Sequence, residues 1–144
     1  MAGPSFYTPK PVSPSRPGKR FTLAEANRTL PLVQRIVGDI VKMHEQVKAL
    51  QEGASATRNK ENAAAQQRQY EQAIERLQTL VDELHGIGCE LKDSQNGLVD
   101  FIGRHQGRDV CLCWKLGEEK VGFWHELQTG FAGRQPVASL QETK

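Results

Sequence analysis

Residues 98–126, LVDFIGRHQGRDVCLCWKLGEEKVGFWHE, decide the fold, because apolar and polar side chains alternate along them with a period of two. This period is typical of β-strands, in which successive side chains point to opposite faces of a sheet. Three strands are expected here, at residues 98–102, 110–116 and 121–126. With a short first strand over 89–93, the sequence predicts three or four strands in an antiparallel β-meander.

The first two clear strands can be aligned through the turn between them. A tight turn centred on Gln106-Gly107 pairs Phe101 with Leu112 and Val99 with Trp114. Residues directly opposite each other in an antiparallel pair lie on the same face of the sheet. These four apolar residues are therefore expected to share one face.

The last two strands are aligned by a second turn, centred on Glu118-Glu119, which pairs Trp114 with Phe123. Both registers then agree on one apolar face, which is expected to cover the helices. It consists of Val99, Phe101, Val110, Leu112, Trp114, Leu116, Val121, Phe123, His125 and Leu127. The opposite face is expected to carry Asp100, Cys111, Cys113, Lys115, Trp124 and Glu126. The pattern leaves open whether Trp114 and Trp124 fill the core or line a pocket.

Two long helices are predicted before the strands, as an antiparallel hairpin over residues 22–87. Thr22 and Glu25 have the spacing of a capping box, which starts a helix. Apolar side chains then recur at steps of three and four residues on two stripes. They are Leu23, Ala26, Leu30, Val33, Val37, Ile40 and Val47, and then Tyr70, Ala73, Ile74, Leu77, Leu80, Val81, Leu84 and Ile87. Residues 52–57 separate the two helices, and Pro31 predicts either a kink or two shorter helices in the first arm.

The fold class is accordingly α+β, with a long helical hairpin packed on a small sheet in a single domain over residues 21–137. Within that domain we expect the hairpin over 22–87, the β-meander over 89–127 and a C-terminal loop over 128–137. Residues 1–20 are predicted to be a disordered, Pro-rich basic arm, and residues 138–144 a tail.

Charge argues against nucleic acid as the main partner. The whole chain has a formal net charge of +2, yet the arm alone holds four basic residues and no acidic one, so the remainder is mildly acidic. A nucleic-acid-binding domain usually presents a clustered basic face. Binding of nucleic acid through the arm is therefore only a weaker alternative. No apolar run is long enough to cross a bilayer, and we expect a cytoplasmic protein without a membrane partner.

The three cysteines are expected to be reduced, because their number is odd and they form no spacing typical of a disulfide framework. Cys89, Cys111 and Cys113 are the thiols that a metal would use. However, Cys111 and Cys113 lack the two-residue spacing of zinc knuckles, and the register turns His125 away from them. We therefore predict no metal and no cofactor.

A polar site near His125 is the alternative that would support enzymatic or metal chemistry. Histidine and a carboxylate are the usual pair for proton transfer, and the candidates for that role are His125, Glu126, Asp93 and Asp100. A histidine that hydrogen-bonds a loop carbonyl at a strand end explains the same pattern without catalysis. Arg134, which follows Gly130 and Gly133, is a candidate for anion binding or for a salt bridge to an acidic residue.

Four segments resemble a known family. They are FTLAEANRTLPLV, GCELKDSQNGLVDF, GRDVCLCWKLGEE and FWHELQTGFAGRQP, and they are similar to the bacterial family catalogued as domain of unknown function 2203. The resemblance runs over about residues 21–137. It implies a small bacterial cytosolic protein, helical first and sheet-like last. It carries no activity, ligand or catalytic residue to any position of this chain.

The hairpin provides the main functional hypothesis. Two helices of about 28 residues would extend roughly 40 Å, longer than a compact domain of this size needs. The outer part, residues 51–69, is polar and has little to bury. We therefore expect a non-enzymatic interaction module that self-associates through the hairpin, as a homo-oligomer or with a partner helix.

Overall fold

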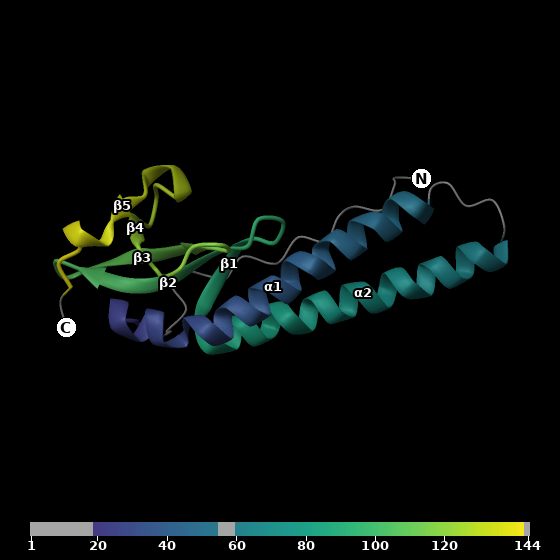
Figure 1. Cartoon of the computed structure of the whole chain (residues 1–144), viewed down its shortest axis with the longest axis horizontal. Helices are drawn as coiled ribbons and strands as arrows, with labels where there is room; N and C mark the ends of the chain where they lie inside the picture. Colours follow the sequence, from purple (N-terminus) through teal and green to yellow (C-terminus); the bar gives the residue numbers. More distant parts are fainter. Residues whose placement is uncertain (1–18, 55–59, 143–144) are drawn as a thin grey trace.

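The computed structural model describes residues 19–54 and 60–142 as a long helical pair with an antiparallel sheet at one end (Figure 1). The helices are α1 (Leu23–Ala54) and α2 (Lys60–Ile87). The strands are β1 (Cys89–Asp93), β2 (Leu98–His105), β3 (Arg108–Lys115), β4 (Phe123–Glu126) and β5 (Gln135–Pro136), with short 3-10 turns η1 (Phe131–Gly133) and η2 (Val137–Ser139). The α+β prediction is confirmed.

The sheet has five strands in the order β1-β2-β3-β4-β5, and every neighbouring pair is antiparallel. Three or four strands were predicted. The additional strand is the two-residue β5, which lies in the segment expected to be a loop and pairs with β4. A strand of two residues, one of them Pro136, is too short to show any periodicity. Residues 1–18, most of the arm predicted to be disordered, lie outside the described residues.

The start of α1 is the capping box that the sequence predicts. The backbone N–H of Glu25 donates to the hydroxyl of Thr22 at 3.1 Å, and the N–H of Thr22 donates to the Glu25 carboxylate at 2.9 Å. α1 then continues through Pro31 as one helix, so the alternative of two shorter helices is wrong. Leu30 and Val33, on either side of this proline, are buried, and their packing stabilises the helix where the proline removes a backbone bond.

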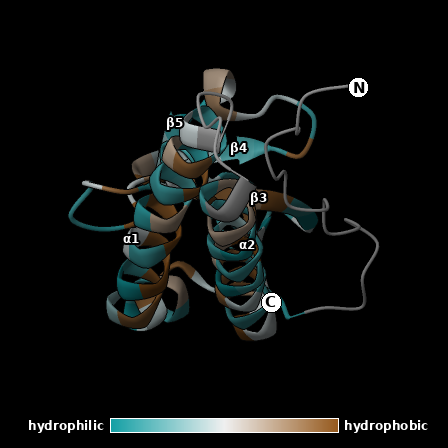
Figure 2. Cartoon of the chain, turned by 90° about the vertical axis from the view of Figure 1, so that its right-hand side faces the viewer, coloured by the Kyte–Doolittle hydropathy of each residue, from teal (hydrophilic) through white to brown (hydrophobic). Residues whose placement is uncertain are grey.

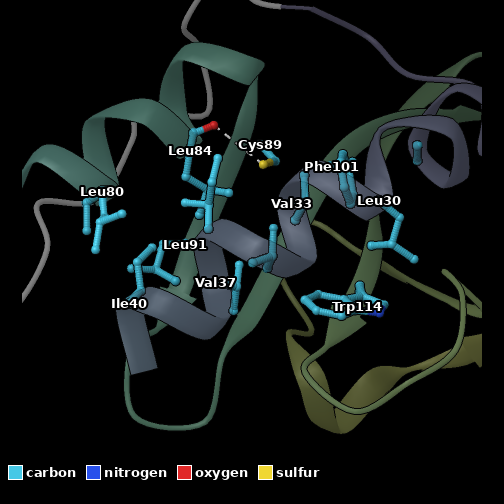
Figure 3. Packing of buried hydrophobic residues seen from close by; sticks show 14 of the residues in the cluster. Leu30, Val33, Val37, Ile40, Leu80, Leu84, Cys89, Leu91, Phe101 and Trp114 are labelled. Atoms are coloured by element: carbon cyan, nitrogen blue, oxygen red, sulfur yellow. Dashed lines mark hydrogen bonds between the residues drawn. The ribbon is translucent and has the colours of Figure 1, made fainter. Parts of the chain in front are cut away.

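One core joins the sheet to the nearer half of the helical pair. Figure 3 shows Leu30 and Val33 of α1 beside Phe101 and Trp114 of the sheet, within a single cluster of buried residues. Figure 2, which views the pair from its far end, shows that hydrophobic and hydrophilic residues share both helices, as expected of amphipathic helices. We call the sheet face that carries Phe101 and Trp114 the inner face, and the opposite one the outer face.

The Asn96-Gly97 turn explains how β2 reaches the helices. Gly97 has a φ of 73°, which L side chains rarely adopt, and a Cβ at this position would lie 2.8 Å from the Leu116 side chain and 2.9 Å from that of Val37. Glycine is therefore required both by the turn and by the close approach of the turn to α1.

The predicted register between β2 and β3 is confirmed, because Phe101 faces Leu112 and Val99 faces Trp114. The predicted register between β3 and β4 is wrong by one residue. Phe123 lies opposite Cys113 instead of Trp114. The turn at residues 106–107 is tight, as assumed, whereas the connection over residues 116–122 is a longer loop.

Tertiary contacts shape that longer loop. The indole N–H of Trp114 donates to the backbone carbonyl of Glu118 at 2.9 Å. The backbone N–H of Val121 donates to the side-chain oxygen of Asn27 in α1 at 2.8 Å. The connection that makes this contact with α1 is longer than the turn predicted at Glu118-Glu119, and the strand that follows is shifted by one residue.

This shift exchanges the faces of all four residues in β4. Trp124 lies opposite Leu112 on the inner face and is buried in the core, where its ring stacks on His105 with centroids 4.4 Å apart. Phe123 and His125 belong to the outer face, opposite Cys113 and Cys111. Glu126 lies opposite Val110, at the inner-face end of the strand. The predicted placement of Phe123 and His125 on the apolar face, and of Trp124 and Glu126 on the opposite one, is therefore wrong.

Among the described residues, no helix is both long enough and apolar enough to span a membrane.

Candidate functional site

The outer face of the sheet holds a cluster of buried polar side chains drawn from three adjacent strands. Asp100 comes from β2, Cys113 from β3 and His125 from β4. All three residues are buried, and their Oδ, Sγ and ring nitrogen atoms lie within 4.8 Å of one another. We call these three residues the outer-face cluster. Antiparallel pairing makes Asp100 and Cys113 direct neighbours, and the shifted register of β4 brings His125 to them.

The ring of His125 is held at both nitrogens. Its Nδ1 lies 2.7 Å from the backbone carbonyl of Glu126, and its Nε2 lies 3.1 and 3.2 Å from the two carboxylate oxygens of Asp100. A carbonyl oxygen only accepts, so Nδ1 carries a hydrogen. Nε2 faces a carboxylate, and it too must donate for the contact to be favourable. The geometry therefore describes a buried imidazolium–carboxylate pair.

The pKa of His125 agrees with this description. Burial by itself lowers the pKa of the imidazole, but hydrogen bonds to Asp100 and Cys113 and the charge of Asp100 outweigh burial and raise the pKa to about 10. Both groups have side chains that are 3% exposed. A charge is stable at that depth because its partner is equally buried and correctly placed.

A second ion pair lies beside the cluster. Glu90 of β1 is the cross-strand neighbour of Asp100, and its carboxylate is 2.7 Å from the ammonium of Lys92. Burial and then the negative charge of Asp100 raise the pKa of the Cys111 thiol above its ordinary value. Two carboxylates therefore face two cationic side chains on this surface, which keeps the buried charge balanced.

The structure brings together two of the four proposed acid–base residues, His125 and Asp100. The Asp93 carboxylate instead caps the turn after β1, where it accepts hydrogen bonds from the backbone N–H groups of Gln95 and Asn96. The Glu126 side chain pairs with Arg108 at 2.6 Å, and only its backbone carbonyl contacts His125.

Arg134 forms the salt bridge that was one of its two predicted roles. Its guanidinium donates to both carboxylate oxygens of Glu118, at 2.6 and 2.8 Å. It also lies over the rings of Phe123 and Phe131, 4.2 and 4.7 Å from their centroids. The group links the C-terminal segment to the loop between β3 and β4. The Glu118 carboxylate matches the charge of Arg134, and anion binding by Arg134 stays a prediction.

The three cysteines are divided between the two faces. Cys89 lies in the hydrophobic core, with its Sγ 3.5 Å from the backbone carbonyl of Leu84 (Figure 3), and burial raises its pKa to about 12. Cys111 and Cys113 lie on the outer face. Sequence reasoning missed the contact between Cys113 and His125 because it assumed the wrong register for β4. The larger apolar surface of Trp124, which favours an inward position over His125, was the signal that could have corrected it.

Comparison with known proteins gives one match. The model of the family described as "Uncharacterized conserved protein (DUF2203)" matches residues 19–137. No curated protein and no solved structure matches the chain.

Proposed function

The chain belongs to the DUF2203 family, described as uncharacterized, and we propose that it is a non-enzymatic interaction module that self-associates through the far part of its helical pair. We call this part, residues 43–54 of α1 and 60–76 of α2, the distal hairpin.

The observation that carries the proposal is the reach of the helices beyond the sheet. At 1.5 Å per residue the 28 residues of α2 span about 42 Å, whereas the longest strands, of eight residues, span about 27 Å. Figure 1 shows the far ends of both helices extending away from the sheet. The distal hairpin therefore has no second layer among the described residues.

Some apolar side chains of the distal hairpin are less completely enclosed than those near the sheet. Near the sheet, Val37 and Leu77 are completely buried. In the distal hairpin Val47 and Ala73 are still buried, but Met43, Leu50 and Tyr70 are only partly buried. The two helices leave part of Met43, Leu50 and Tyr70 in contact with water, so a further helical surface would increase the apolar area removed from water.

A crevice between the two helices offers a place for such a surface. It has a volume of about 530 Å³ and opens on the distal hairpin. Its walls are Met43, Gln46, Ala49, Leu50, Gln69, Gln72, Ala73 and Arg76. Methionine, leucine and alanine provide apolar contact, while glutamine and arginine provide a polar rim, which is the usual composition of a protein interface.

A second copy of this chain is the occupant that the charges favour. Exposed or partly exposed charges of both signs are interspersed along the two helices. They are Lys42, Glu45 and Lys48 on α1 and Arg68, Glu71, Glu75 and Arg76 on α2. When positive and negative side chains are mixed on a surface, two copies of that surface can pair about a two-fold axis without large groups of like charges facing each other. Two hairpins paired in this way would form a four-helix bundle.

The state of the polar residues supports a non-enzymatic role. Both ring nitrogens of His125 are engaged, and the raised pKa values of the Cys89 and Cys111 thiols disfavour the nucleophilic thiolate. Neither the crevice between the helices nor the smaller one beside Asp93 has His125 or Asp100 in its walls. A general base needs access to a substrate proton.

Size-exclusion chromatography with light scattering over a concentration series tests the proposal on the full chain. We expect a dimer, and we expect Met43→Glu combined with Leu50→Glu to raise the dimer dissociation constant by at least about tenfold, because both carboxylates would be desolvated in the interface. The matched control is Leu32→Glu, since Leu32 is 50% exposed outside the distal hairpin. A monomer at the highest concentration, or equal weakening by the control, would overturn the proposal.

A further inference from the structure

We propose that Asp100, Cys113 and His125 form a binding site for a single divalent transition-metal ion of the zinc class, buried on the outer face of the sheet. This inference does not depend on self-association, because the outer-face cluster lies on the sheet and not on the distal hairpin.

The donor set is the first argument. Thiolate, imidazole and carboxylate are the three side-chain ligands that zinc uses in proteins, and each residue of the cluster supplies one. The set differs from a cluster of acidic residues, which is common on protein surfaces without any ion. Here the donors are of three chemical kinds and all are buried.

The distances are the second argument. In a tetrahedral zinc site with metal–nitrogen and metal–oxygen bonds of about 2.0–2.2 Å, the nitrogen and oxygen ligands lie about 3.3 Å apart. Nε2 of His125 is 3.1 and 3.2 Å from the two oxygens of Asp100. Cys113 Sγ lies within 4.8 Å of both partners. A metal ion can therefore be accommodated by small side-chain rotations on three paired strands.

The support around the histidine is the third argument. A metal-bound histidine usually donates its other N–H to a carbonyl or carboxylate, which fixes the ring orientation. His125 makes this bond through Nδ1 to the Glu126 carbonyl at 2.7 Å. The neutral ring then has its lone pair on Nε2, directed at the Asp100 carboxylate. Two electron-rich groups at this distance require a cation between them, which is a proton in the metal-free protein and would be the metal ion in the bound form.

Charge balance is the fourth argument. A divalent ion with one thiolate, one carboxylate and a neutral imidazole has no net charge. The bound site therefore avoids the free-energy cost of burying a net charge. The adjacent ion pair of Glu90 and Lys92 is itself neutral. Binding would release the Nε2 proton of His125 and the thiol proton of Cys113 to solvent. The N–H and S–H bonds that break would be replaced by metal–nitrogen and metal–sulfur bonds.

Cobalt(II) is the probe, added to the full-length, reduced and metal-free protein. We expect one equivalent to give the visible bands of a tetrahedral site and a thiolate-to-cobalt charge-transfer band, both removed by one equivalent of zinc. Cys113→Ser should abolish the charge-transfer band and weaken zinc binding more than about tenfold. Cys89→Ser is the matched control, because Cys89 is an equally buried thiol on the inner face, and it should retain the band.

The absence of stoichiometric cobalt and zinc binding by the folded wild-type protein would overturn the proposal, and the outer-face cluster would then be an ion pair only. A charge-transfer band that survives Cys113→Ser, or that Cys89→Ser removes, would overturn it equally. Circular dichroism establishes that each variant is folded. If Cys113→Ser is not, Asp100→Asn is the second variant, which should keep the band and weaken zinc binding. Unchanged zinc affinity in Asp100→Asn would contradict the site.

Discussion

The two faces of the sheet are both buried, but they are stabilised in different ways. Leu112 and Cys113 are consecutive residues of β3, and both are fully buried. Leu112 points into the apolar core that the sheet forms with α1 and α2. There, removal of apolar surface from water stabilises the fold, and this effect does not depend on the direction of individual contacts. Cys113 points toward Asp100 and His125, where each donor needs an acceptor. Burial alone therefore does not distinguish a core from a candidate site.

Removal of Trp114 should have the largest effect and tests the inner face. Trp114 is fully buried, packs in the core and donates its indole N–H to the Glu118 carbonyl. We expect Trp114→Ala to reduce the free energy of unfolding by about 3–5 kcal/mol, measured by urea denaturation at neutral pH. The control is Leu127→Ala at an exposed position, expected within about 0.5 kcal/mol of wild type. A loss below about 1 kcal/mol for Trp114→Ala would show that the inner face is not the main core.

Removal of one charge from the outer face should have the next largest effect. In the presence of a chelator, Asp100→Leu leaves His125 buried without its carboxylate, and we expect a loss of about 3 kcal/mol in urea denaturation. Asp100→Leu combined with His125→Leu should recover most of this loss, because an apolar pair of similar size carries no desolvation penalty. A double variant as unstable as the sum of its single changes would mean that the two groups act independently, contrary to the directional pairing described for this face.

Acid sensitivity should give the smallest effect, at the edge of the outer face. Burial raises the pKa of Glu118, but hydrogen bonds from Arg134 and the backbone N–H of Lys115 lower it below the ordinary value of 4.5. A lowered pKa in the folded state means that the carboxylate stabilises the fold above its unfolded pKa and loses this contribution as the pH falls through the folded pKa.

Between about pH 6 and pH 3, wild type should therefore lose more stability than Glu118→Gln, by less than about 1 kcal/mol because the pair is partly exposed. Urea denaturation at several pH values measures the difference. The control is Glu119→Gln at the neighbouring exposed residue, which should follow wild type. Identical pH dependence for wild type and Glu118→Gln would remove the assigned role of the Arg134 salt bridge.

Sequence patterns were sufficient where the determining contacts are short in range. The capping box at Thr22 and Glu25 involves residues three apart, and the tight turn at residues 106–107 sets the register of β2 and β3. Asp100 and His125 were both named as candidates from residue type. Their contact was not, because it depends on the alignment of β4.

The order of helices and strands, their amphipathic faces and the α+β class therefore follow from local periodicity, since each residue's neighbours along the chain establish it. The face on which His125 lies depends on the path of residues 116–122, which is held by Asn27 of α1, distant in the sequence. A shift of one residue in a strand reverses every side chain, so packing in three dimensions placed the imidazole beside Asp100 and Cys113.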